Sequence, residues 1–80
     1  MENELFSEQV QIERKHFYFD LKENPRGRFL RITEDVGGRR DTIIVPTTGL
    51  ESFRDCLDKM IVGEEELRKN DPEVDPEESS

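Results

Sequence analysis

The sequence is poor in the residues that build catalytic sites and disulfide frameworks. Its 80 residues include one cysteine, one histidine, no tryptophan and no alanine. A single cysteine excludes a disulfide within the chain, and Cys56 fits a small apolar residue of a helix. No Gly-rich phosphate loop, metal-ligand spacing or Ser/His/Asp set occurs, and His16 has no catalytic partner in the pattern. We therefore expect no enzyme, no cofactor, no metal site and no small-molecule substrate.

Long apolar runs are also missing. No stretch approaches the roughly 20 residues that a membrane-spanning helix needs. The first nine residues, MENELFSEQ, lack the basic and apolar regions of a signal peptide. A lone cysteine suits a reducing compartment. We expect a cytoplasmic protein without membrane contact, and association with the nucleoid is left open.

Positive charge is scarce and unevenly placed. Twelve Lys and Arg face 20 Asp and Glu, for a net charge of -8. Residues 14–40 nevertheless hold eight basic and four acidic side chains, whereas residues 64–80 hold two basic and eight acidic ones. A local basic face matters more for phosphate contact than the total charge does. From charge alone, an acidic protein with merely solvated basic residues is an equally good interpretation.

Residues 14–32, RKHFYFDLKENPRGRFLRI, predict a β-hairpin. Aromatic, apolar and basic residues alternate on both sides of the turn at residues 24–27. An even loop places Leu21 opposite Leu30, and a slip of one residue would turn the apolar set outward. We therefore predict the register that pairs these two leucines.

The same register predicts the chemistry of the other face. Lys22 faces Phe29, Asp20 faces Arg31, and Tyr18 lies on the same side by period two. Rings and cations on one face are typical of a platform for single-stranded nucleic acid, where bases stack on aromatic rings and phosphates meet cations. The ordinary interpretations are an interface ring for Phe29 and an ion pair for Arg31.

The remaining elements follow from turn and helix signals. Gly37-Gly38 indicates a hairpin apex, Pro46 ends a strand, and Thr48 with Glu51 forms a capping-box pattern. We expect a flexible segment 1–5, strands over about 6–13, 14–23, 28–35 and 40–46, a helix over about 48–67 and a disordered acidic tail 68–80.

Apolar residues of the last strand and the helix predict a core or dimer interface. One stripe recurs at helical spacing, and residues 43–45 are apolar on both sides of the strand. The predicted set is Leu50, Phe53, Leu57, Met60, Ile61 and Ile44.

Three segments resemble a known family. FYFDLKENPRGRFLRI, GGRRDTIIVP and LESFRDCLDKM are similar to the PUR repeat of the purine-rich-element-binding proteins, over roughly residues 10–62. The resemblance implies an α+β fold, with a four-stranded antiparallel sheet followed by one helix, and two intertwined repeats. It also implies binding of single-stranded DNA or RNA with a purine-rich preference. A single repeat of the bacterial type would form the unit as a homodimer.

The resemblance also assigns site residues. The K-E-N string of PUR repeats matches Lys22 and Asn24, and Pro25 departs from the polar or basic residue that is frequent after it. Arg26 matches the basic residue of the turn, and Phe29 matches an aromatic that stacks on a base. The predicted nucleic-acid-binding residues are Lys22, Asn24, Arg26, Phe29, Arg31, Arg39 or Arg40, and, from the sheet pattern, Tyr18.

The sequence thus predicts a single-stranded nucleic-acid-binding protein in transcriptional or post-transcriptional control. A different class is a protein-interaction adaptor that uses the acidic tail or a sheet edge. A weaker third interpretation is an acidic decoy that mimics nucleic acid.

The acidic tail generates a prediction. An anionic segment beside a basic face should compete with phosphate, because like charges repel over a screening length set by salt. Truncation after Leu67 should therefore tighten single-strand binding at low ionic strength, and the gain should fade as salt rises. Fluorescence polarisation of both proteins checks this, and equal affinities at low salt would point to a solubilising tail.

Overall fold

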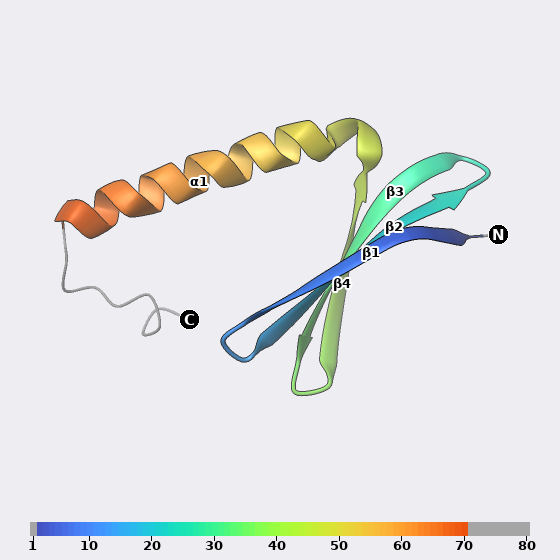
Figure 1. Cartoon of the computed structure of the whole chain (residues 1–80), viewed down its shortest axis with the longest axis horizontal. Coiled ribbons are helices and arrows are strands. Elements are labelled where there is room, and N and C mark those ends of the chain that lie inside the picture. The colour runs from blue at the N-terminus through green and yellow to red at the C-terminus, as the bar shows by residue number, and fades with distance from the viewer. Residues whose placement is uncertain (1, 71–80) are drawn as a thin grey trace. The chain divides into compact units, whose positions relative to one another are not determined.

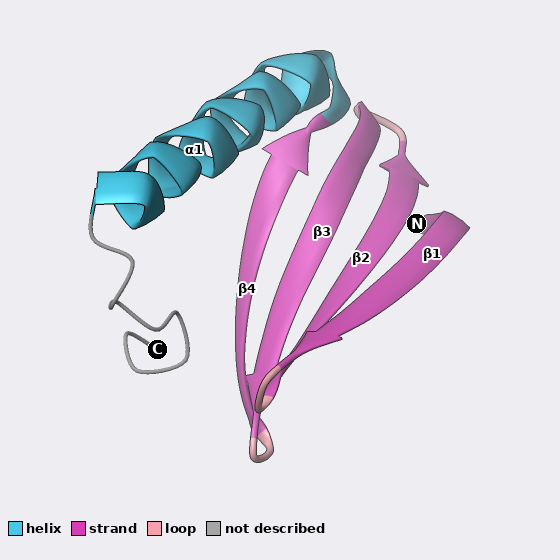
Figure 2. Cartoon of the chain, turned by 60° about the vertical axis from the view of Figure 1, so that its left-hand side comes forward, coloured by secondary structure: helices cyan, strands magenta, loops and turns pink. Residues whose placement is uncertain are grey.

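The chain forms a four-stranded sheet followed by one long helix (Figure 1). The computed structural model describes residues 2–70. The strands are antiparallel and lie in the order β1-β2-β3-β4, so neighbours in the sheet are neighbours in the sequence (Figure 2). This confirms the predicted α+β fold. The elements are β1 (Asn3–Ile12), β2 (Lys15–Asn24), β3 (Gly27–Val36), β4 (Arg39–Pro46), a 3-10 turn η1 (Thr47–Gly49) and α1 (Leu50–Asn70).

The β2–β3 hairpin has the predicted register. Leu21 pairs with Leu30, and the strands continue until Asn24 pairs with Gly27, which leaves a two-residue turn. The Asn24 side-chain oxygen accepts a hydrogen bond of 2.9 Å from the Arg26 backbone N–H. Gly27 adopts a φ of 139°, a region that side chains rarely occupy. Local chemistry of the turn therefore supports the register that the leucine pair requires.

Strand β1 begins earlier than the sequence predicts. It starts at Asn3, inside the segment 1–5 that the pattern indicated as flexible. The pairing with β2 shifts between Glu4 and Phe6, so Leu5 is an extra residue. Such a β-bulge breaks the alternation of side chains. The pattern before Phe6 therefore does not look like a strand, although the backbone continues as one.

The helix begins and ends later than predicted. Pro46 is followed by the turn η1, and α1 starts at Leu50 instead of residue 48. The Thr47 hydroxyl donates to the Arg28 carbonyl at 3.3 Å, which ties η1 to β3. Thr48 lies within η1, two residues before α1 starts, so it does not stand directly before the helix as the predicted capping box requires. The helix runs through Gly63 to Asn70, and the rest of the predicted tail lies outside the described residues.

The two faces of the sheet differ in composition. Paired residues of adjacent strands share a face. One face, here called the apolar face, carries Phe6, Val10, Phe17, Phe19, Leu21, Leu30, Ile32, Ile43 and Val45. The other face carries most of the predicted site residues.

The described part of one chain contains no buried hydrophobic side chain. Among residues 2–70, Thr33 is the one buried residue, at 8% exposure, and no hydrophobic side chain is buried. Phe6 and Ile43 of the apolar face are 61% and 53% exposed, and Leu57 of α1 is 52% exposed. Of the residues predicted to form a core or dimer interface, Leu50 is half-buried and the others are exposed in one chain. Their burial stays a prediction about an assembly. Within the described residues, no helix combines the length and apolarity needed to cross a membrane.

The hairpin turn can be tested through its glycine. Gly27→Ala places a side chain at a φ of 139° and should destabilise the fold by about 1–3 kcal/mol. Gly63→Ala is the matched control, because a Cβ there meets open space in a helix and should stabilise by about 1 kcal/mol. Urea unfolding of both variants measures the difference, and equal stabilities would contradict a strained turn.

Candidate functional site

The face opposite the apolar one, here called the polar face, gathers chemistry from all four strands. The pairings place rings, cations, carboxylates and hydroxyls on one surface. Five of the eight predicted residues are among them. The polar face consists of Ser7, Gln9 and Gln11 of β1, His16, Tyr18, Asp20 and Lys22 of β2, Phe29, Arg31, Thr33 and Asp35 of β3, and Arg40, Thr42 and Ile44 of β4.

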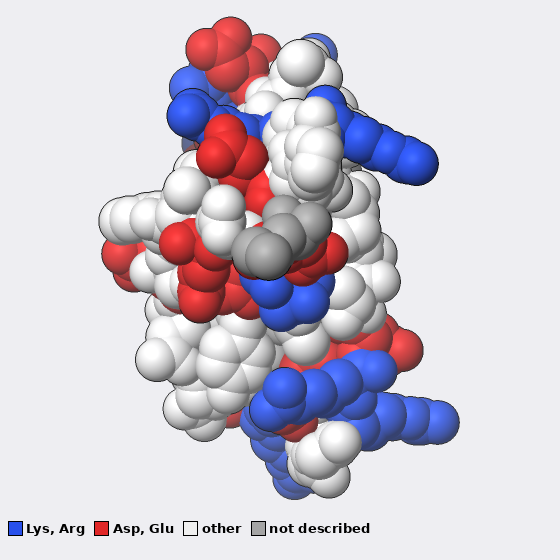
Figure 3. Space-filling model, turned by 90° about the vertical axis from the view of Figure 1, so that its right-hand side faces the viewer, with Lys and Arg blue, Asp and Glu red and all other residues white. Residues whose placement is uncertain are grey.

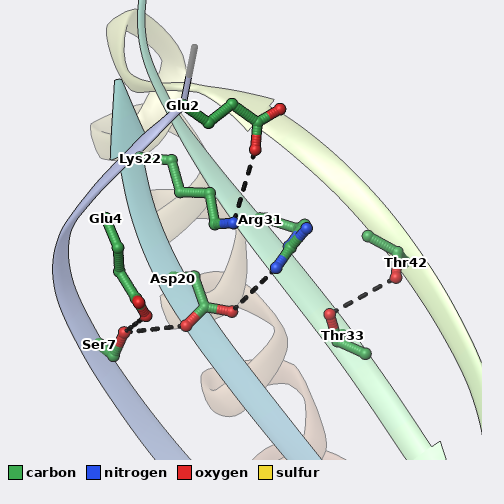
Figure 4. A network of polar contacts seen from close by, with 8 residues as sticks. All are labelled: Glu2, Glu4, Ser7, Asp20, Lys22, Arg31, Thr33 and Thr42. Carbon is green, nitrogen blue, oxygen red and sulfur yellow. Dashed lines mark hydrogen bonds and ion pairs between the residues drawn. The ribbon is translucent and has the colours of Figure 1, made fainter. Parts of the chain in front are cut away.

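A carboxylate lies near the middle of the polar face (Figure 4). The Ser7 hydroxyl lies 2.9 Å from Asp20 Oδ1 and also contacts a carboxylate oxygen of Glu4, and it can donate its single hydrogen to one of the two at a time. Arg31 Nη2 lies 3.9 Å from Asp20 Oδ2, a distance of ionic contact without a close hydrogen bond. Arg31 Nε is buried and has no partner among the described residues. The guanidinium of Arg31 is therefore only loosely held by the protein itself.

Lys22 and Phe29 lie side by side near the β2–β3 turn. They are a direct pair, and Pro46 is the partner of Phe29 on β4. Phe29 is half-buried, and the Lys22 side chain is 15% exposed. Lys22 Nζ lies 3.5 Å from a carboxylate oxygen of Glu2, which precedes β1 (Figure 4). The cation and the ring thus form one small surface at this end of the sheet.

An aromatic stack lies toward the other end of the polar face. The rings of His16 and Tyr18 are parallel within 5°, and their centroids are 4.9 Å apart. The Arg40 guanidinium carbon lies 5.7 Å from the centroid of the Tyr18 ring, within the range of a cation–π contact. His16 Nε2 is 3.0 Å from the Gln9 side-chain oxygen. The two rings and the Arg40 guanidinium therefore lie together at this end of the polar face.

The three other predicted residues lie elsewhere. Asn24 ends β2 on the side of Lys22, and its side-chain oxygen is occupied by the turn. Arg26 stands in that turn and is exposed. Arg39 pairs with Val36, whereas Arg40 pairs with Asp35. Of the two arginines that the sequence left open, Arg40 therefore belongs to the polar face and Arg39 to the opposite one.

The cations of the polar face are paired with carboxylates of the same chain. Arg40 Nε lies 3.0 Å from Asp35, and Lys22 and Arg31 have the partners described above. Figure 3 shows Lys and Arg side chains interspersed with Asp and Glu over one side of the molecule. In each of these pairs one side chain is less than a fifth exposed, namely Lys22, Asp20 and Asp35, while its partner is more exposed. These carboxylates lower the positive potential of the polar face.

Sequence analysis missed three residues of the polar face. His16 was given no role, although its spacing from Tyr18 by two residues already placed both rings on one side. Asp20 was interpreted as an ion-pair partner only. Thr33 shares a contact of 3.4 Å with the Thr42 hydroxyl, a pairing that becomes visible only with the β3–β4 register. Within the described residues, no group of His, Cys, Asp and Glu could hold a metal ion.

Comparison with known proteins gives one consistent result. The family PurA, described as ssDNA and RNA-binding protein, matches residues 1–80. Transcription factor Pur-alpha 1 of Arabidopsis thaliana is 52% identical over 62 residues, 78% of this chain and 21% of that protein. Human transcriptional activator protein Pur-alpha is 45% identical over 64 residues, 71% of this chain and 20% of that protein. Human transcriptional regulator protein Pur-beta is 37% identical over 71 residues, 88% of this chain and 23% of that protein. The chain spans about a fifth of the length of these relatives.

Proposed function

Because the chain belongs to the PurA family of ssDNA- and RNA-binding proteins, we propose that the polar face of its sheet binds single-stranded DNA or RNA. One observation carries the proposal: the rings of Tyr18 and Phe29 and the cations of Lys22, Arg31 and Arg40 share one face. Single-strand binding needs both kinds of group on one surface, since bases stack on rings while the backbone follows the cations.

Each residue type has its own role in this proposal. Phe29 stacks on a base and Tyr18 on a second one, because every base offers a flat face. The side-chain oxygen of Asn24 is engaged in the turn, so its amide NH₂ is the group that donates to a base edge or a phosphate. Phosphates are held by Lys22, Arg26, Arg31 and Arg40.

The biological role that we propose is regulation of transcription or of RNA, with a preference for purine-rich strands. The similar proteins are named as transcription factors, activators and regulators. A platform without a catalytic constellation fits binding rather than turnover. The lone Cys56, exposed on α1, suits the cytoplasmic location proposed here.

We further propose that two copies of this fold assemble into a homodimer. In one chain the apolar stripe of α1 is mostly exposed, and the apolar face of the sheet is half-buried or exposed. Apolar surfaces of this extent mark contact sites, because their exposure to water is unfavourable. A second copy supplies a sheet and a helix with the same unpaired surfaces, so it can cover them in an isologous arrangement.

Binding to a labelled purine-rich single strand tests the first proposal. Phe29→Ala should weaken the binding free energy by roughly 1–3 kcal/mol if a base stacks on the ring. Arg31→Ala should weaken binding across sequences and reduce the salt slope by about one phosphate contact. Fluorescence polarisation at several salt concentrations measures both effects. If both variants fold and bind the strand with the affinity of the parent, the site assignment is wrong.

A matched pair of arginines provides the control. Arg39 and Arg40 are neighbours on β4, but they belong to opposite faces. Each change to alanine removes the same charge, so long-range attraction falls equally. Arg40→Ala should therefore weaken binding more than Arg39→Ala does, and the reverse order would place the ligand on the other face.

The homodimer generates a separate prediction. Leu57→Asp puts a charge on the apolar stripe of α1, and an unpaired buried charge costs several kcal/mol. Sedimentation equilibrium at micromolar concentration should show a dimer for the parent and for Ser52→Asp, which adds the same charge on the other side of the helix. The Leu57→Asp protein should be monomeric or unfolded. A folded parent with the 9.4 kDa mass of one chain would contradict the homodimer.

A further inference from the structure

A small depression lies within the polar face. It has a volume of about 200 Å³, below the roughly 300–1,000 Å³ of pockets that hold drug-sized ligands. Its size suits a single flat group. It is lined by Tyr18, Asp20, Arg31, Thr33 and Arg40.

A carboxylate in this depression is unexpected for a surface that holds phosphates. The Asp20 side chain is 17% exposed, so its charge is only partly solvated. It repels a phosphate and attracts N–H donors. Oδ1 lies 2.9 Å from the Ser7 hydroxyl, which it shares with Glu4, and Oδ2 has only the loose contact of 3.9 Å with Arg31. A carboxylate offers about four acceptor sites, so Asp20 retains acceptor capacity toward a ligand.

The bases differ in what they offer to a carboxylate. In a single strand the Watson–Crick edges are exposed and can be read. Guanine presents two adjacent donors, N1–H and the N2 amino group, beside the acceptor O6. Adenine and cytosine each place a ring-nitrogen acceptor next to their amino group, and thymine and uracil place carbonyls on both sides of one N–H. Only guanine can therefore donate two hydrogen bonds to one carboxylate.

We propose that Asp20 and Arg31 read the Watson–Crick edge of a guanine that occupies this depression. Asp20 accepts from N1–H and the N2 amino group. Arg31, whose guanidinium carries five N–H donors, donates one of them to O6 and keeps others for the phosphate assigned to it above. Ser7 acts as a positioning residue when its hydroxyl, 2.9 Å from Asp20 Oδ1, donates to that carboxylate rather than to Glu4 (Figure 4). Tyr18, held by the stack with His16 and by Arg40, supplies the ring beside the base. The inference rests on the proposed single-strand binding and assigns its base selectivity to one residue pair.

The test varies the base and the protein together. Three strands of equal length alternate thymine with guanine, with hypoxanthine or with adenine, so that charge is constant and no run of guanines occurs. Hypoxanthine keeps N1–H and O6 but lacks the N2 amino group. The parent should bind the guanine strand about tenfold more tightly than the adenine strand, in line with the discrimination of one bidentate contact. The hypoxanthine strand should lie between them.

Asp20→Asn replaces one acceptor oxygen by a donor while preserving shape. In this variant the guanine and hypoxanthine strands should bind with equal affinity. The adenine strand should bind more tightly than it binds to the parent, because an amide pairs with adenine through one donor and one acceptor. Asp41→Asn is the control, since it changes the net charge equally on an exposed residue of the opposite face. That variant should keep the guanine preference of the parent.

The outcomes separate the two proposals. Equal affinities of the parent for all three strands would overturn guanine recognition and leave single-strand binding intact. Retained guanine preference in a folded Asp20→Asn protein would also overturn it. Absence of binding to every strand would overturn the proposed function itself. If Asp20→Asn unfolds, the comparison of guanine with hypoxanthine in the parent still decides, because it needs no altered protein.

Discussion

The register of the β2–β3 hairpin is the constraint on which the polar face depends. Leu21 opposite Leu30 places one set of alternating residues on the apolar face and the other set on the polar face. A slip of one residue would move Lys22 and Arg31 to different sides. The two-residue turn closed by Asn24 and Gly27 is compatible with one register only. A local turn and a pair of leucines thus determine which groups can meet a ligand together.

Internal ion pairing explains how an acidic chain can present a site for a polyanion. Lys22, Arg31 and Arg40 each lie close to a carboxylate of the same chain. The polar face of the free protein therefore carries no strong positive field. Each pair keeps one exposed member, which a ligand can approach from solvent. In the proposed binding, specific contacts therefore matter more than bulk attraction, and the rings supply much of the affinity. Asp20 differs from the other carboxylates because it lies inside the depression, where a ligand would meet it directly.

Much of this fold could be predicted from the sequence, and the exceptions have physical causes. The leucine pair and the face shared by Lys22, Phe29 and Arg31 follow from strict alternation around one turn. The ion pair of Asp20 with Arg31 follows from the same register.

Three features could not be predicted, each for a local reason. The bulge at Leu5 hides the start of β1, because it interrupts the alternation on which the interpretation depends. The contact of Lys22 with Glu2 was missed for the same reason, since the segment before residue 6 looked flexible. The contact of Arg40 with the Tyr18 ring could be predicted only from the β3–β4 register, and the pair Gly37-Gly38 does not determine that register.

The order β1-β2-β3-β4 has a consequence for how the molecule reaches its folded state. Each strand pairs with a strand that is adjacent to it in the chain. The sequence separation between paired residues is therefore short, and closing the loops between them costs little entropy. Hairpins of this kind form in roughly 1–10 μs. The apolar face gains its cover only in a bimolecular encounter, whose rate falls with dilution. Folding of the proposed homodimer should thus divide into a fast step that is independent of concentration and a slower step that depends on it. In a cell, the abundance of the chain would then set how much of it is structured.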